Sequence, residues 1–93
     1  MIRLMQAADV EAVVKIERLV QSHPWTLKQF QDAVTAYQST VIEVQGQVAG
    51  FCILQPVLDE ANLLLMAIDP AQQGQGLGYQ LLEASVGMPQ SPC

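Results

Sequence analysis

The stretch MAIDPAQQGQGLGY, residues 66–79, decides the fold of this 93-residue chain. It continues an unbroken apolar run that begins at Leu63, which predicts a strand buried on both faces, as a central strand would be. Asp69-Pro70 ends that strand, Gln73 to Gly78 predicts a glycine-rich turn, and a helix is expected from Leu77 to about Val86. Free amides in such a loop, with the positive end of a helix dipole, form a site for an anion such as pyrophosphate.

The spacing of these glycines excludes two phosphate-binding motifs. The dinucleotide fingerprint G-x-G-x-x-G requires glycine where this chain has Tyr79, and an acidic residue about 20 positions on, beyond the last residue. The nucleotide P-loop requires a lysine after its last glycine, and no lysine follows Lys28.

Two helices are predicted earlier in the chain. The first begins near Asp9 and has an apolar stripe at helical spacing, formed by Val10, Val13, Ile16 and Val20. Its end is marked by Pro24, because the residue before a proline is pushed out of the helical region.

The second helix, about Leu27 to Tyr37, has a well-marked start. Thr26 and Gln29 form a capping box, and Trp25 and Phe30 are spaced as a hydrophobic staple. Trp25 is therefore explained equally well by packing and by substrate contact, and His23 is more simply a loop residue than a catalytic one.

Four strands are predicted, at residues 2–5, 40–44, 48–54 and 62–68. Gly46 supplies a positive φ in the hairpin between the second and third. Pro56 is expected to end the third strand, and Asp59 and Glu60 to lie in the next turn. The order of elements predicts an α/β or α+β sheet with flanking helices, whose last helix would lead to a parallel strand that these residues do not contain.

Composition limits the class of protein. Hydrophobic residues make up 51% and charged residues 14%, which argues against disorder and is expected of a piece of a larger domain. The net charge is −5 and every lysine and arginine lies within residues 1–28, so no nucleic-acid partner is expected. No membrane span, signal peptide or disulfide framework is recognisable, and Cys52 is expected in the core while Cys93 lies in a loose tail; these features predict a cytoplasmic protein.

The pattern Gln73-x-x-Gly76-x-Gly78 resembles the Q/R-x-x-G-x-G/A acetyl-CoA signature of the GNAT N-acetyltransferase superfamily. Residues 66–70 are similar to the family's fourth strand and the turn after it. Within the superfamily, residues 23–26 (His-Pro-Trp-Thr) and 58–61 (Leu-Asp-Glu-Ala) most resemble the ribosomal-protein-alanine N-acetyltransferases. The likeness covers about residues 2–86. It implies a mixed, mostly antiparallel GNAT sheet, incomplete at its C-terminal end, with 87–93 as a tail outside the family pattern.

The resemblance also implies a function. Acetyl-CoA would be the co-substrate, without a metal, and acetyl would pass directly to an α-amine, the N-terminal alanine of a ribosomal protein. His23, Pro24 and Trp25 would shape the acceptor groove. The residues implied in cofactor binding are Met66, Ala67, Ile68, Gln73, Gly74, Gln75, Gly76, Leu77, Gly78 and Tyr79.

Two departures from the family pattern matter. The loop lacks the cation that the family usually offers beside it. The family's catalytic glutamate and tyrosine belong beyond Cys93, so no catalytic residue is expected within the chain, and the turn carboxylates Asp59 and Glu60 are expected to be solvated. Three hypotheses stay open: the N-terminal part of an acetyltransferase, a module that binds coenzyme A or a partner without activity, and a half-domain that completes its sheet by pairing with another chain through its exposed fourth strand.

Overall fold

The computed structural model describes residues 1–87; Pro89, Pro92 and Cys93 of the expected tail lie outside them. The elements follow in the order β1 (Ile2–Leu4), a 3₁₀ turn (Ala7–Asp9), α1 (Val10–Val20), α2 (Leu27–Ala36), β2 (Gln38–Val44), β3 (Gln47–Val57), β4 (Glu60–Ile68), a second 3₁₀ turn (Pro70–Gln72) and α3 (Leu77–Gly87). The predicted order of strands and helices is confirmed, and α3 extends one residue into the expected tail.

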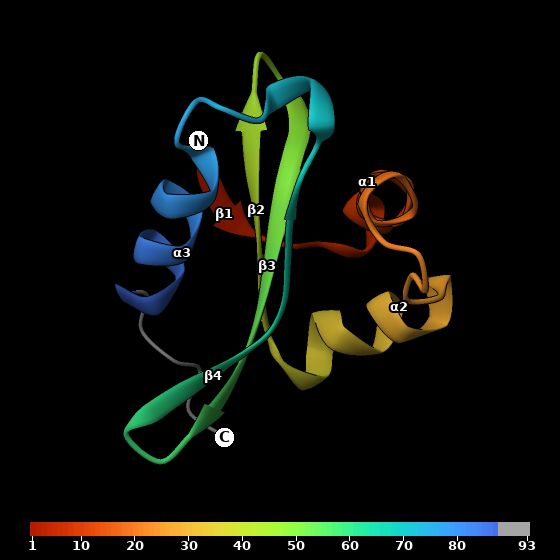
Figure 1. The fold of residues 1–93 in the computed structure, drawn as a ribbon. Coiled ribbons are helices and arrows are strands. Elements are labelled where there is room, and N and C mark those ends of the chain that lie inside the picture. The colour runs from red at the N-terminus through yellow and green to blue at the C-terminus, as the bar shows by residue number, and fades with distance from the viewer. Residues whose placement is uncertain (88–93) are drawn as a thin grey trace.

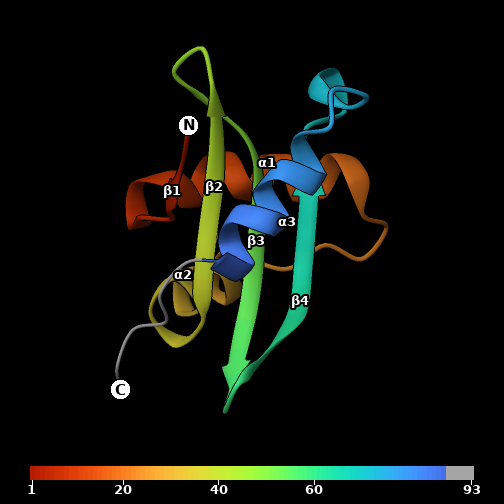
Figure 2. The same ribbon diagram turned by 90° about the vertical axis from the view of Figure 1, so that its left-hand side faces the viewer.

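The four strands form one antiparallel sheet in the order β1-β2-β3-β4 (Figures 1 and 2). Gly46 turns the chain between β2 and β3 with φ +80°, as predicted, and Gln45 beside it also has a positive φ. A two-residue turn with two positive φ angles matches the twist of the strands it joins.

The third strand does not end at Pro56. β3 runs to Val57, and Pro56 pairs with Ala61 of β4. Pairing with β2 already stops at Leu54, so the N–H that proline lacks has no partner strand on that side. Because β3 continues past Pro56, the β3–β4 hairpin is longer than predicted. Glu60 is therefore the first residue of β4 and does not lie in the turn.

β4 is an edge strand of this sheet, and the prediction of a strand buried on both faces was wrong for its first half. Leu63 is 48% and Leu64 36% exposed, whereas Ala67 is buried. The second half of the apolar run is covered on both faces of the sheet, because it lies between the helices of the two layers.

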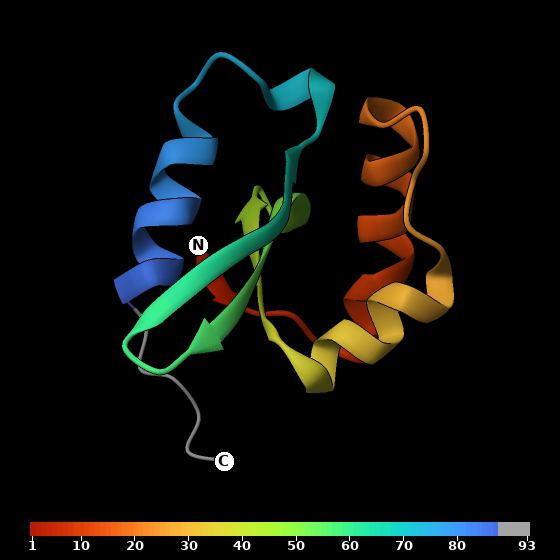
Figure 3. The ribbon, with the colours of Figure 1, turned by 60° about the horizontal axis from the view of Figure 1, so that its bottom comes forward.

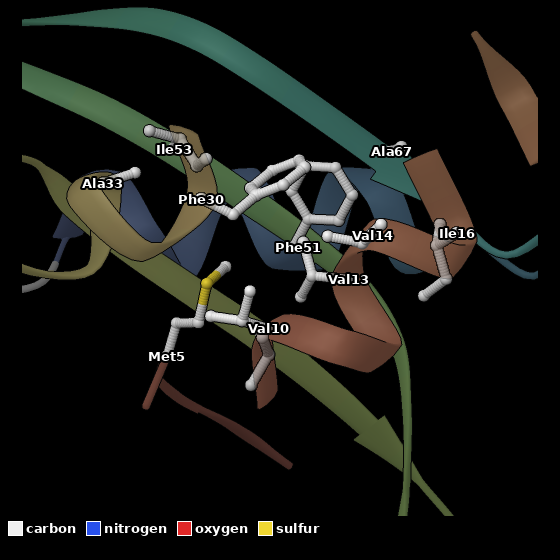
Figure 4. Close-up of a cluster of buried hydrophobic side chains, with 11 residues drawn as sticks. Met5, Val10, Val13, Val14, Ile16, Phe30, Ala33, Phe51, Ile53 and Ala67 are labelled. Carbon is white, nitrogen blue, oxygen red and sulfur yellow. The ribbon is translucent and has the colours of Figure 1, made fainter. Parts of the chain in front are cut away.

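The helices lie on opposite faces of the sheet, α1 and α2 on one and α3 on the other (Figures 1 and 3). On the first face, Phe30 of α2 and Phe51 of β3 pack edge to face with ring centroids 5.3 Å apart, in the middle of the cluster in Figure 4. Val10, Val13 and Ile16 of the predicted stripe are buried there. The amphipathic pattern of α1 is thereby confirmed.

The second face is covered by α3, whose Leu81 is fully buried against β2 and β3. The hydroxyls of Ser85 and Thr40 lie 2.6 Å apart beneath the helix and satisfy each other. Cys52 is a buried core residue, as predicted, and burial raises the pKa of its thiol, which makes it a poor nucleophile.

An ion network ties β1 to its neighbours. Arg3 donates two hydrogen bonds to Asp9, at 2.7 and 2.9 Å, and a further one to Glu43 of β2. Asp9 also accepts the main-chain N–H of Gln6. The hydrogen bonds from the Arg3 guanidinium hold the pKa of the Asp9 carboxyl below its usual range. The hydrogen bonds to Asp9 and then to Glu43 raise the pKa of Arg3 in turn. Among residues 1–87, no helix is long and apolar enough to cross a membrane.

Candidate functional site

The outer edge of β4, beside the glycine-rich loop, pairs with no further strand among residues 1–87. The N–H of Asp69 donates to the carbonyl of Ala49 at 2.7 Å, so Asp69 and, by antiparallel alternation, Ala67 form their hydrogen bonds with β3. The main-chain groups of Met66 and Ile68 therefore face away from β3. Their side chains pack under α3.

β4 also carries a bulge. Ile53 pairs with Leu65 and the next residue, Leu54, pairs with Leu63, which leaves Leu64 as the extra residue. A bulge bends the strand and increases its local twist. The free edge of β4 is thus reshaped a few residues before it enters the loop.

The turn after β4 is fixed by its own side chains. Asp69 accepts the N–H of Ala71 at 2.9 Å, and Pro70 stands in the first position of the short 3₁₀ turn. The side chain of Gln73 reaches back and donates to the carbonyl of Ile68 at 3.2 Å. The first residue of the Q-x-x-G-x-G pattern therefore holds the loop against the end of the strand.

Two glycines of the loop have left-handed backbones. Gly74 has φ +87° and Gly76 φ +75°, and a Cβ at either position would meet no atom within 4 Å. Glycine is required there by the backbone angle and not by crowding, and the space above the loop is open.

Gly78 differs, because a Cβ there would rest 3.6 Å from the Ile68 side chain, in ordinary contact. This agrees with a signature that allows glycine or alanine at its last position.

The loop leads directly into the N-terminus of α3. The first main-chain bond of the helix runs from Gln80 N–H to the carbonyl of Gly76, at 3.1 Å. The N–H groups of Leu77, Gly78 and Tyr79 precede that bond and have no acceptor within the helix. Together with the positive end of the helix dipole, these donors are an arrangement suited to an anion.

The Tyr79 side chain is 74% exposed and lines a shallow hollow of about 350 Å³ with Leu82, Glu83 and Val86. It points to the outer surface of α3.

The segment from His23 to Trp25 joins α1 to α2. In Figure 2 this connection begins beyond the free edge of β4 and then passes behind β4 towards α2, in the layer of the two helices. His23 and Pro24 are exposed, and the ring of His23 is hydrogen-bonded to the hydroxyl of Ser22, at 3.2 Å between Nδ1 and Oγ. Trp25 is half-buried.

The predicted start of α2 is confirmed in both its parts. Thr26 and Gln29 form the capping box, with bonds of 2.8 and 3.2 Å, and the rings of Trp25 and Phe30 lie 5.4 Å apart as the staple requires.

Glu17 is a feature of this region that the sequence analysis missed. Its side chain is 1% exposed, and its Oε2 accepts the main-chain N–H of Trp25 at 3.0 Å. The signal was present, since Glu17 follows Val10 and Val13 at spacings of seven and four and so occupies the apolar stripe of α1. A charged residue on a buried stripe is informative because it must be held by a partner.

The carboxylates considered as candidate catalytic groups are either distant from the glycine-rich loop, engaged in a turn or exposed. Asp59 and Glu60 are exposed at the tip of the β3–β4 hairpin, as solvated groups, and eight residues of strand put Glu60 roughly 27 Å from Ile68. Asp69 is engaged in its turn and Glu83 lies exposed on α3. Within residues 1–87, no three His, Cys, Asp or Glu side chains are grouped to hold a metal ion.

The chain belongs to the acetyltransferase (GNAT) domain family, whose model matches residues 35–90. It is 39% identical over 80 residues to the [Ribosomal protein bS18]-alanine N-acetyltransferase of Escherichia coli K12. That match covers 85% of this chain and 54% of the relative, so the chain spans about half the length of the curated relatives it matches.

Solved structures agree in fold. The crystal structure of the ribosomal-protein-S18-alanine N-acetyltransferase from E. coli has a TM-score of 0.82 at 38% identity, with 90% of this chain and 55% of that one covered. The paiA N-acetyltransferase from Thermoplasma acidophilum, in complex with coenzyme A, has a TM-score of 0.80 at 15% identity, with 91% and 68% covered. The expected GNAT fold is confirmed.

Proposed function

We propose that this chain provides the acetyl-CoA site and part of the acceptor groove of a cytoplasmic N-terminal acetyltransferase. The observation that carries the proposal is the continuous junction of β4, loop and α3. An edge strand with outward-facing backbone groups enters a loop with two left-handed glycines, which opens onto the free amides of a helix. The name of the E. coli relative supports the acceptor, an N-terminal alanine of a ribosomal protein.

The described residues fit acetyl-CoA in two ways. The amides of residues 74–79 suit the pyrophosphate, and the open space above Gly74 and Gly76 leaves room for it. The outward N–H and carbonyl of Met66 and the outward N–H of Ile68 suit the amides of the pantetheine arm, whereas the Ile68 carbonyl already accepts the side chain of Gln73. The loop contains no lysine or arginine, so anion binding rests on main-chain donors and the helix dipole.

Acetyl transfer forms an N–C bond to the acceptor's α-amine and breaks the C–S bond of the thioester. A base must take the ammonium proton, and an acid must protonate the leaving thiolate. Asp59 and Glu60 lie at the far end of the hairpin, and Asp69 is engaged in its turn. We therefore assign binding and orientation to this chain and expect no turnover from the 93 residues by themselves.

The cofactor site is tested by Gly76→Val, measured by titration calorimetry with acetyl-CoA. A β-branched residue resists φ +75°, so the loop must change shape and binding should be lost. Gly46→Val is the matched control, because it places the same residue at φ +80°, also in open space, in the β2–β3 turn. Gly46→Val should weaken folding and keep binding. Equal affinity of Gly76→Val and the parent chain would contradict the site.

The catalytic assignment is tested by joining residues 1–86 to the C-terminal part of the E. coli relative. The joined protein should acetylate an alanine-initiated peptide, and glutamine in place of the supplied catalytic glutamate should remove most of that activity. General acid and base groups contribute about 10²–10⁴-fold each. Turnover by the 93-residue chain alone, surviving Asp59→Asn and Glu60→Gln, would show that the chemistry lies elsewhere. Binding without activity in the joined protein would favour a coenzyme A-binding module.

A further inference from the structure

One residue holds both ends of the connection between α1 and α2. The main-chain carbonyl of Glu17 accepts the N–H of Gln21 at 2.9 Å, which closes the last turn of α1. The side-chain Oε2 of the same residue accepts the N–H of Trp25 at 3.0 Å, just before the cap of α2. The segment 21–25 is thus tied to Glu17 where it leaves α1 and where it enters α2.

The carboxylate of Glu17 is costly where it stands. The residue is 1% exposed, and Oε1 has no hydrogen-bond partner within residues 1–87. Burying a carboxylate without full pairing is unfavourable, and an apolar residue of similar volume is often neutral or stabilising at such a position. The free energy of unfolding therefore does not explain why a glutamate occupies position 17. The hydrogen bond to the Trp25 amide does explain it.

That bond fixes the main chain of the connection at Trp25, whose ring is also held by packing against Phe30. Pro24 has no N–H to donate, and the hydrogen bond of the His23 ring within residues 1–87 is to the neighbouring Ser22. The amide of Trp25 is the point at which a side chain of α1 reaches the segment. The proposed function assigns part of the acceptor groove to residues 23–25, so the position of this segment would affect the shape of that groove.

We propose that Glu17 is a positioning residue of the acceptor groove. This inference rests on the proposed function: through the Trp25 amide, Glu17 holds His23 and Pro24 where a peptide with a free α-amino group binds. It acts through the segment and does not touch the peptide.

The test compares Glu17→Leu, Glu17→Gln and the control Glu11→Gln, an exposed change on the same helix. Trp25 is the sole tryptophan, so acrylamide quenching of its fluorescence reports the segment alone. Glu17→Leu should melt at the parent temperature or above it, because a buried charge is removed. Its Trp25 should nevertheless be quenched more strongly. Glu17→Gln keeps an oxygen for the Trp25 amide and should restore the parent value, as should Glu11→Gln.

The consequence for binding is measured with a synthetic alanine-initiated peptide and with acetyl-CoA. Glu17→Leu should bind the peptide about tenfold more weakly, because binding must then order a segment that the Glu17–Trp25 hydrogen bond holds in the parent chain, and one bond to a charged group corresponds to about that factor. Its affinity for acetyl-CoA should not change. If the parent chain binds the peptide and Glu17→Leu binds it equally well, the inference is overturned.

The proposed function and this inference can fail separately. If the parent chain binds no peptide, the acceptor proposal fails, while quenching still decides whether Glu17 holds the segment. Equal quenching of Glu17→Leu and the parent overturns the inference whatever the peptide does. If Glu17→Leu does not fold, amide exchange of the parent chain decides: Trp25 must exchange more slowly than Ser22 and His23, and equal rates refute the proposal.

Discussion

Gly50 offers a sharp test of how closely β3 and β4 are packed. It lies in the central strand, opposite Ile42 of β2 and Ile68 of β4. A Cβ at this position would approach the Ala67 carbonyl oxygen to 2.9 Å and Ile42 Cγ2 to 3.3 Å, and would overlap the end of the Ile68 side chain. The Ala67 oxygen is backbone, so relief requires β4 itself to move.

The expected cost of Gly50→Ala follows from these contacts. Overpacking of this kind costs about 1–3 kcal/mol, and the restricted unfolded chain returns about 0.4–1 kcal/mol. We expect a net loss of about 1–2 kcal/mol in the free energy of unfolding, which corresponds to about 4–16 °C in a chain of this size. Urea denaturation and thermal melting followed by circular dichroism measure both quantities.

Gly78→Ala is the matched control, because its Cβ would lie 3.6 Å and 3.9 Å from Ile68 and Met66. This variant should be as stable as the parent, or more stable by up to about 1 kcal/mol through helix propensity. If Gly50→Ala unfolds at the same urea concentration as the parent, β3 and β4 are not as closely packed as the contacts indicate.

Two further predictions concern the ion network and the free edge. Arg3 lowers the pKa of Asp9, so the stabilisation is present above the unfolded value of about 3.9 and is lost as pH falls through the lower folded value. Asp9→Asn should therefore lower stability at pH 7 and flatten its decline in acid, and parallel acid denaturation curves for both proteins would contradict this. Residues 63–68 are apolar, uncharged and free of proline, and Leu63 and Leu64 are exposed, so the chain should self-associate at micromolar concentration and Leu64→Lys should reduce it. A monodisperse parent monomer in light scattering would refute that expectation.

The sequence by itself determined the features whose causes lie within a few residues. The capping box of Thr26 and Gln29, the positive φ of Gly46 and the loop from Gln73 to Gly78 follow from local hydrogen bonding and local backbone freedom. The order of elements and the family signature were accessible for the same reason, and they predict an anion site at this loop.

Only the tertiary structure decided the features that depend on which strand lies beside which. The apolar composition of β4 does not distinguish a central strand from an edge strand whose second half is covered by helices on both faces. Pro56 can remain in β3 because the pairing of β3 with β2 stops at Leu54. No local sequence pattern shows where that pairing stops. The sequence places Glu17 on the apolar stripe of α1, but only folding shows that its partner is the Trp25 amide, at 3.0 Å. A buried polar group is defined by partners distant along the chain, so its role appears only once the chain has folded around it.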